Sequence, residues 1–161
     1  MTRKRAGLTA SLALLALALA VPAAQAKSRH SYSSTLQSTA LSTGSGYPSP
    51  GGTAVLAGTW NSKLFGAGSV VDHVKITGRP DDTTFAFKGT EVCFAAAGTI
   101  RDTFTGTAVV LPDGSQKLSI KGSFTGGSGA YKGAKGTYTF TGATAPGSLV
   151  VNGRSAGTLT Y

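Results

Sequence analysis

The chain has few of the side chains from which metal sites, disulfides and nucleophilic centres are built. Its 161 residues include one cysteine, Cys93, so no disulfide can form within the chain. Cys93 lies between Val92 and Phe94 with no histidine close in sequence, which is typical of a buried, unreactive thiol. The two histidines, His30 and His73, are too far apart in sequence to indicate a zinc site. We expect no metal, no other cofactor and a fold stabilised by its hydrophobic core.

Acidic residues are scarce as well, six against fifteen Lys and Arg, which gives a net charge of +9. No acid follows Asp113, and the five basic residues beyond it are Lys117, Lys121, Lys132, Lys135 and Arg154. A positive surface would attract anionic cell-wall polymers. The basic residues are spread out and few aromatic residues lie between them, so nucleic-acid binding is not expected. Solvated side chains that keep a barrel soluble are the simpler interpretation.

The N-terminal residues have the pattern of a secretory signal peptide. Three basic residues at positions 3–5 precede an uncharged apolar run, residues 8–21, and an Ala-Gln-Ala cleavage pattern follows at 24–26. The run is shorter than the roughly 20 apolar residues that span a bilayer, so we expect cleavage after residue 26 rather than a retained membrane span. The product would be secreted and extracellular. It would keep twelve Lys and Arg against six acids, a net charge of +6.

Residues 27–52 have too little apolar content to predict a folded segment. Eleven of these 26 residues are Ser or Thr, and no hydrophobic period is sustained. Such a segment buries too little apolar surface to offset the entropy of ordering. We predict a disordered Ser/Thr-rich leader here, followed by one folded domain at residues 53–161.

The folded domain is predicted to be all-β because no stretch keeps helical spacing and glycine recurs throughout. Turn residues at 79–82 and 112–114 separate the candidate strands, and Asn152-Gly153 is the pair typical of a two-residue hairpin turn. The predicted strands are residues 53–56, 69–76, 83–88, 92–98, 103–111, 116–124, 136–142, and a final hairpin of 148–151 with 155–161.

Alternation shows that one face of the predicted sheet is apolar. Leu118, Ile120 and Phe124 share one phase, whereas Lys117 and Lys121 share the other. With no helices to cover it, such a sheet closes into a barrel or packs on a second sheet, and the length favours a single small antiparallel β-barrel of about eight strands. A membrane barrel is not expected, because membrane strands need roughly 9 to 11 residues and an apolar outer face, whereas the second face here is polar.

The glycine-rich segment GGSGAYKGAKGT, residues 126–137, is the most distinctive motif of the chain. It resembles the GGTG-aromatic-x-GA-x-G segment of dirigent proteins and allene oxide cyclase-like barrels, including small secreted bacterial members. The resemblance is specific over residues 122–142 and implies an eight-stranded antiparallel barrel with a hydrophobic cavity. The physical interpretation is that the glycines permit a tight bulged corner and that Tyr131 caps the end of the barrel.

Three acidic residues are candidate catalytic groups: Asp72, Glu91 and Asp102. Asp72 and Asp102 share the phase of apolar strand positions, Glu91 is the only glutamate, and Arg101 is a candidate counter-charge for Asp102. A buried carboxyl group needs a partner or a raised pKa, which is how catalytic acids arise. Acids near turns are also commonly solvated, so the residues alone do not decide whether the chain is an enzyme.

Four aromatic residues on the predicted inner face are candidate ligand-binding groups: Phe85, Phe87, Tyr138 and Phe140. Trp60 and Phe65 either gate a cavity or plug the mouth of the barrel.

Two function classes remain open. The resemblance implies a barrel that binds a hydrophobic small molecule, and the alternative is a non-catalytic extracellular or cell-wall-associated module that acts through its basic surface. Interior volume separates the two classes: if the small residues Ala95, Ala97 and Gly122 face inward together, a cavity is expected.

Overall fold

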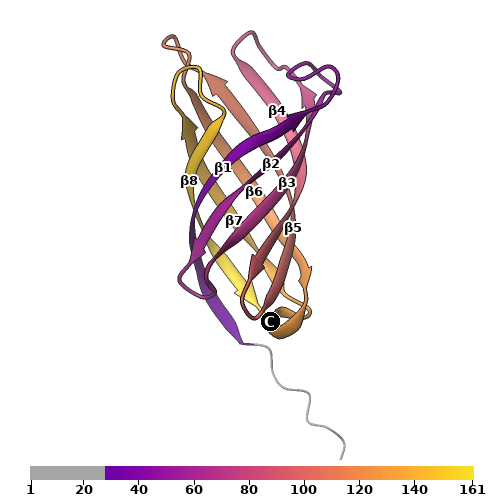
Figure 1. The fold of residues 1–161 in the computed structure, drawn as a ribbon, viewed down its shortest axis with the longest axis vertical. Helices are drawn as coiled ribbons and strands as arrows, with labels where there is room; N and C mark the ends of the chain where they lie inside the picture. The colour runs from indigo at the N-terminus through magenta and orange to yellow at the C-terminus, as the bar shows by residue number, and fades with distance from the viewer. Residues whose placement is uncertain (1–27) are drawn as a thin grey trace, which may run out of the picture.

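The computed structural model describes residues 28–161, so the expected signal peptide at 1–26 lies outside the described residues. The chain forms a closed antiparallel β-barrel in which each strand pairs with the next and the last pairs with the first (Figure 1). This confirms the predicted fold class. The strands are β1 Arg29–Thr43, β2 Thr53–Ser62, β3 Gly66–Gly78, β4 Thr84–Ala95, β5 Gly98–Val110, β6 Gln116–Gly127, β7 Lys135–Thr144 and β8 Val150–Thr160, with a short 3-10 turn, η1, at Gly129–Tyr131.

The first strand of the barrel lies within the segment predicted to be a disordered leader. β1 pairs with β2 along one edge and with β8 along the other, so it closes the barrel. Its inward side carries Tyr32, Ser34 and Ser38, all buried, with Leu36 between them. The prediction for residues 29–43 was wrong because Ser34 and Ser38 interrupt the inward apolar residues and the outward residues are mostly Ser or Thr, so the hydrophobic alternation is weak. Two paired edges also satisfy the backbone groups of a segment with little apolar surface.

Two predicted strand breaks are absent, because residues 84–95 form β4 alone and residues 150–160 form β8 alone. The predicted hairpin turn at Asn152-Gly153 is therefore wrong. Gly153 lies in the middle of β8 opposite Gly142, and the ring of Phe140 covers both. A Cβ atom at Gly153 would collide with that ring. The glycine at 153 makes room for an aromatic side chain rather than for a turn.

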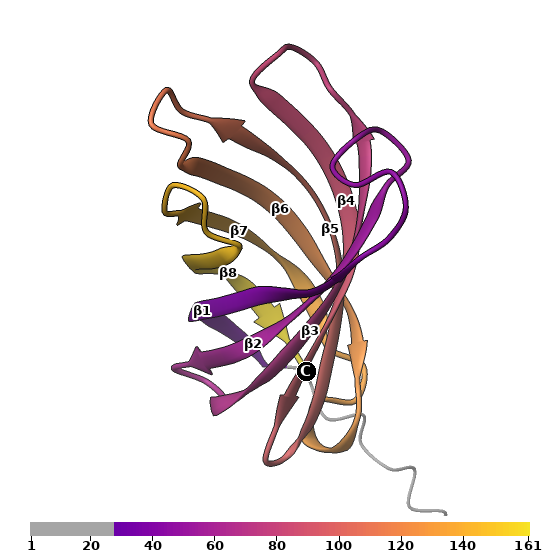
Figure 2. The same ribbon diagram turned by 45° about the horizontal axis from the view of Figure 1, so that its top comes forward.

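The remaining turns and the alternation are as predicted. Asp81 Oδ1 accepts hydrogen bonds from Thr83 and Thr84 in the turn after β3, and Asp113 Oδ1 accepts from Ser115 in the turn after β5. These turns lie with the loops after β1 and β7 at one end of the barrel, which we call the loop end (Figure 2).

The strands, at 10 to 15 residues, are longer than the sequence indicated. The argument that the strands are too short for a membrane barrel was therefore wrong. The second argument, that the outer face is polar, agrees with the structure. On β6, Lys117, Ser119, Lys121 and Ser123 are all exposed. None of the helical structure in residues 28–161 is long and apolar enough to cross a membrane.

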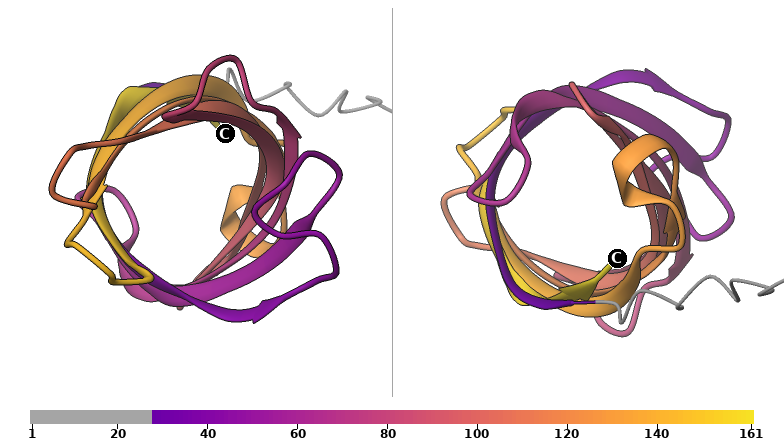
Figure 3. Two further views of the ribbon diagram at one scale, coloured as in Figure 1. Left: turned by 90° about the horizontal axis from the view of Figure 1, so that it is seen from above. Right: turned by 90° about the horizontal axis from the view of Figure 1, so that it is seen from below.

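The end opposite the loop end is filled by an aromatic plug of four side chains: Trp60, Phe65, Tyr131 and Tyr161. The ring of Phe65 lies 4.6 Å from that of Tyr131 and 5.7 Å from that of Trp60, centroid to centroid. Figure 3 shows η1, which carries Tyr131, turned inward at the rim of this end of the barrel. Trp60 and Phe65 are buried, so they plug the barrel, and Tyr131 caps it as predicted. We call this the closed end.

Gly122 on β6 lies directly opposite Tyr138 on β7, and a Cβ atom at this glycine would collide with the Tyr138 ring. We predict that Gly122→Ala lowers the free energy of unfolding by about 1–3 kcal/mol, because the ring must move in a packed interior. Gly78→Ala is the control, since its added Cβ meets no atom within 4 Å. Urea denaturation measures both variants, and equal losses of stability would contradict this account of Gly122.

Candidate functional site

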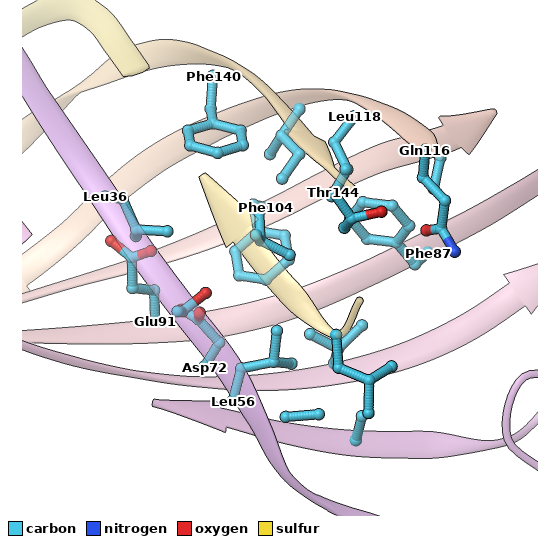
Figure 4. A pocket seen from close by; sticks show the side chains of 18 of the residues that line it. Leu36, Leu56, Asp72, Phe87, Glu91, Phe104, Gln116, Leu118, Phe140 and Thr144 are labelled. Atoms are coloured by element: carbon cyan, nitrogen blue, oxygen red, sulfur yellow. The ribbon is translucent and has the colours of Figure 1, made fainter. Parts of the chain in front are cut away.

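A cavity of about 420 Å³ occupies the barrel interior above the aromatic plug (Figure 4). It runs from Trp60 at the closed end to Tyr47, Pro48 and Leu149 in the loops at the other end. Most of its lining is apolar. The four aromatic residues proposed from the sequence, Phe85, Phe87, Tyr138 and Phe140, all line it.

The space in the cavity does not come from the small residues named in the sequence analysis. Ala97 is exposed in the turn after β4, and the space above Gly122 is taken by Tyr138. The small side chains that do line the cavity are Ala40, Ala54 and Ala108, together with Ser34, Ser38 and Ser155.

All three candidate acids face the barrel interior and lie side by side on neighbouring strands. In the strand register Asp72 of β3 is opposite Glu91 of β4, and Glu91 is opposite Asp102 of β5. Figure 4 shows the carboxyl groups of Asp72 and Glu91 close together at one end of the pocket. Asp72 and Glu91 line the cavity, and Asp102 is buried behind them. We call these three side chains the acid row.

Hydrogen bonds hold the acid row from one side. The Tyr138 hydroxyl donates to Asp102 Oδ1 at 2.9 Å, and the Cys93 thiol donates to Glu91 Oε1 at 3.0 Å. One oxygen of each aspartate, Asp72 Oδ1 and Asp102 Oδ2, has no hydrogen-bond partner among the described residues. The row therefore has unused acceptor capacity inside the barrel.

No lysine or arginine of the described residues compensates the acid row, and the nearby His73, exposed on the outer face beside Asp72, lowers the pKa of Asp72 by less than burial raises it. Arg101, the candidate counter-charge, is exposed on the outside of the barrel, because successive residues of a strand point to opposite faces. The proposed pairing of Arg101 with Asp102 is therefore wrong.

Burial without a counter-charge raises the pKa of every carboxyl group in the row. Burial raises the pKa of Asp72 from 3.8 to about 6 and that of Asp102 to about 7. Burial, then the nearby Asp102 and Asp72, raises the pKa of Glu91 well above its ordinary value. Glu91 is half-buried and lines the cavity rather than the outer face of the barrel. The row thus retains protons in the pH range where exposed carboxyl groups are ionised.

The thiol of Cys93 behaves as the sequence indicated. It is free and buried, and burial together with the neighbouring Glu91 raises its pKa. A protonated thiol that donates to a carboxyl group is a weak nucleophile. Cys93 therefore serves the site as a hydrogen-bond donor.

Sequence reasoning missed the contribution of β1 to the site. Tyr32 and Ser34 line the cavity, and the Tyr32 hydroxyl accepts a hydrogen bond from Trp60 Nε1 at 3.2 Å. The Tyr32 and Ser34 hydroxyls are 2.9 Å apart. The signal that could have found them is the alternation of Tyr32, Ser34, Leu36 and Ser38 within residues treated as a disordered leader.

The site offers no evident metal centre. Within residues 28–161, no three His, Cys, Asp or Glu side chains are arranged to hold a metal ion. What the arrangement offers is an apolar chamber with hydrogen-bond acceptors and exchangeable protons at its inner end.

Comparison of the chain with models of known protein families, with curated proteins and with solved structures gives no match. The relationship to allene oxide cyclase and dirigent barrels thus stays a prediction from residues 122–142.

Stability should fall as pH rises, because the folded pKa values of Asp72 and Asp102 exceed the unfolded value near 3.8. The folded state then binds more protons between about pH 4 and 7, so the stabilising protonation is complete below pH 3.8 and is lost through pH 6 to 7. We predict a loss of roughly 3 kcal/mol from Asp72 alone over the whole range, of which about 2 kcal/mol falls between pH 4.5 and 8. Urea denaturation at pH 4.5, 6 and 8 measures it.

Asp72→Asn should reduce this pH dependence by the share that Asp72 contributes, whereas Asp82→Asn, an exposed position at the loop end, should leave it unchanged. A wild-type barrel that gains stability from pH 4.5 to 8 would contradict the geometry of the acid row.

Proposed function

We propose that the barrel binds a hydrophobic small molecule in its central cavity. The observation that carries the proposal is the cavity itself, whose volume of about 420 Å³ falls in the range of small-molecule sites. The interior of an eight-stranded barrel is just wide enough either to be filled by its own side chains or to hold one small ligand. Open volume inside this barrel therefore favours the ligand.

The chemistry of the lining supports the same function. Phe85, Phe87 and Phe140 supply apolar surface, and the acid row supplies a few polar groups at one place. Mostly apolar walls with a small number of placed polar groups are typical of ligand sites. The resemblance of residues 122–142 to allene oxide cyclase-like and dirigent barrels favours the same ligand class.

We also propose that the protein acts outside the cell. The support is the signal-peptide pattern of residues 1–26.

Filling the cavity tests the proposal. Ala108 is buried and lines the cavity, so Ala108→Trp places an indole in the space that a ligand would occupy. We predict that wild-type protein binds 1-octanol with one-to-one stoichiometry by isothermal titration calorimetry and that Ala108→Trp reduces the affinity at least tenfold. Ala143→Trp, an exposed position on β7, is the matched control and should bind like wild type. Undiminished binding to Ala108→Trp would place the ligand elsewhere.

A second candidate function is favoured by the distribution of charge. All six acids lie either in the acid row or in the turns at the loop end, so the outward strand faces carry none. Lys75 of β3 lies directly opposite Lys88 of β4, and Lys121 of β6 borders the same outer groove. We call these three lysines the basic wall. Like charges directly opposite each other are unfavourable, and an anionic polymer would relieve them.

We predict that the triple variant Lys75→Gln, Lys88→Gln, Lys121→Gln binds inorganic polyphosphate at least tenfold more weakly than wild type in low salt. The control variant Lys63→Gln, Lys132→Gln, Lys135→Gln removes the same charge from exposed positions at the closed end and should keep most of the affinity. Fluorescence anisotropy with labelled polyphosphate measures both. Equal losses of affinity in the two variants would show that the basic wall contributes only through the net charge of the protein.

A further inference from the structure

We infer that the ligand of the cavity carries an organic ammonium group, which Glu91 and Asp72 bind at the inner end while its apolar part extends toward the loop end. The inference rests on the proposed binding function and specifies the chemistry of the ligand. The proposed function requires only an apolar ligand, whereas this inference adds a cationic group that binds the acid row.

The first argument is charge. Every lysine and arginine among residues 28–161 is exposed, His73 is exposed too, and the half-buried His30 stacks on Tyr161 at the closed end, so no lysine or arginine of the described residues reaches the acid row. Three carboxyl groups are nevertheless gathered there on adjacent strands. Buried carboxyl groups without a counter-ion are costly, and a bound cation removes that cost. The missing charge is positive.

The second argument is hydrogen bonding. Asp72 is only 6% exposed, lines the cavity and leaves Oδ1 without a partner among the described residues. Glu91 has one donor on Oε1, the Cys93 thiol. A primary ammonium group brings three donors, whereas a hydroxyl group brings one and a carboxylate brings none. An ammonium group therefore matches the acceptors that the acid row presents.

The third argument is the position of the acids within the cavity. Figure 4 shows Asp72 and Glu91 near Leu36 and Leu56 at one end, with Gln116 and Phe87 farther along the pocket. An amphiphile with its cationic end at the acid row would lay its apolar part along the aromatic and aliphatic walls. The loop end, where Leu149 is exposed and also lines the cavity, gives the apolar end its exit.

Binding of a cation must also compete with the protons of the acid row. Inside the barrel, the titratable groups that face the row are the Cys93 thiol on β4, the Tyr138 hydroxyl on β7 and the Tyr32 hydroxyl on β1, all neutral because burial raises their pKa. His73 interacts with Asp72 from the exposed outer face of β3. Among the groups inside the barrel, the carboxyl groups are the ones that change charge between pH 5 and 8. Affinity for an alkylammonium ion should rise over this range, and affinity for the matching alcohol should not.

The test compares three probes of equal chain length, octylammonium, 1-octanol and octanoate, by isothermal titration calorimetry on residues 27–161 at pH 5 and pH 7.5. We expect octylammonium to bind at least tenfold more tightly than 1-octanol at pH 7.5, with a smaller margin at pH 5. Octanoate should bind most weakly, because the acid row repels it.

Three variants test whether Glu91 and Asp72 cause the preference for octylammonium. Glu91→Gln and Asp72→Asn keep the shape of each side chain, so each should bring octylammonium binding down to the level of 1-octanol while 1-octanol still binds. Retained 1-octanol binding also shows that the variants fold. Asp82→Asn removes an equal charge at the loop end and should leave the preference for octylammonium intact.

The outcomes separate the two proposals. Binding of 1-octanol that equals or exceeds binding of octylammonium overturns the ammonium inference and leaves the cavity as an apolar site. A preference for octylammonium that persists in both Glu91→Gln and Asp72→Asn also overturns it. If none of the three probes binds, both the inference and the proposed function fail.

Discussion

Pairing of β1 with both β2 and β8 is the constraint on which the site depends. An open sheet would leave Asp72, Glu91 and Asp102 on a wetted face, where water would solvate their carboxylates. Closure puts the same residues inside a protein wall, and the aromatic plug shuts one end. The serine-rich inner side of β1 leaves space instead of filling it, so closure and cavity come from the same strand. The raised pKa values follow from that enclosure.

Closure of the barrel separates basic side chains on the outside from acidic side chains on the inside. The strands present lysine, threonine and serine outward, and they keep three of the six acids inward. Because three of the six acids are enclosed, the outer surface of the barrel is more positive than the sequence composition suggests. The proposed anionic partner would bind the outer surface, and the proposed ammonium ligand would bind in the interior. The two candidate functions therefore use opposite faces of the same strands and do not compete for residues.

The sequence predicted what depends on period-two alternation and missed what depends on pairing. Asp72 and Asp102 could be placed inward because each shares a phase with apolar neighbours, and the same rule excludes Arg101, which adjoins Asp102. That Asp72, Glu91 and Asp102 lie in one row depends on the register of three strands, which no local pattern contains. β1 was missed because two of its buried inward residues are serine, which weakens the hydrophobic alternation. Gly153 was misread because glycine serves close packing as well as turns.

The central claim, that three carboxyl groups are enclosed together without a counter-charge, is tested most directly by titrating them. Carbon-detected NMR of the Asp and Glu side-chain carboxyl carbons follows each group through pH. The account predicts that Asp72 and Asp102 titrate near pH 6 and 7 and Glu91 well above its ordinary pKa, while hydrogen bonds in the turns keep Asp81 and Asp113 below theirs. Ordinary titration of all three inward acids near pH 4 would show that water reaches them, and would contradict the account.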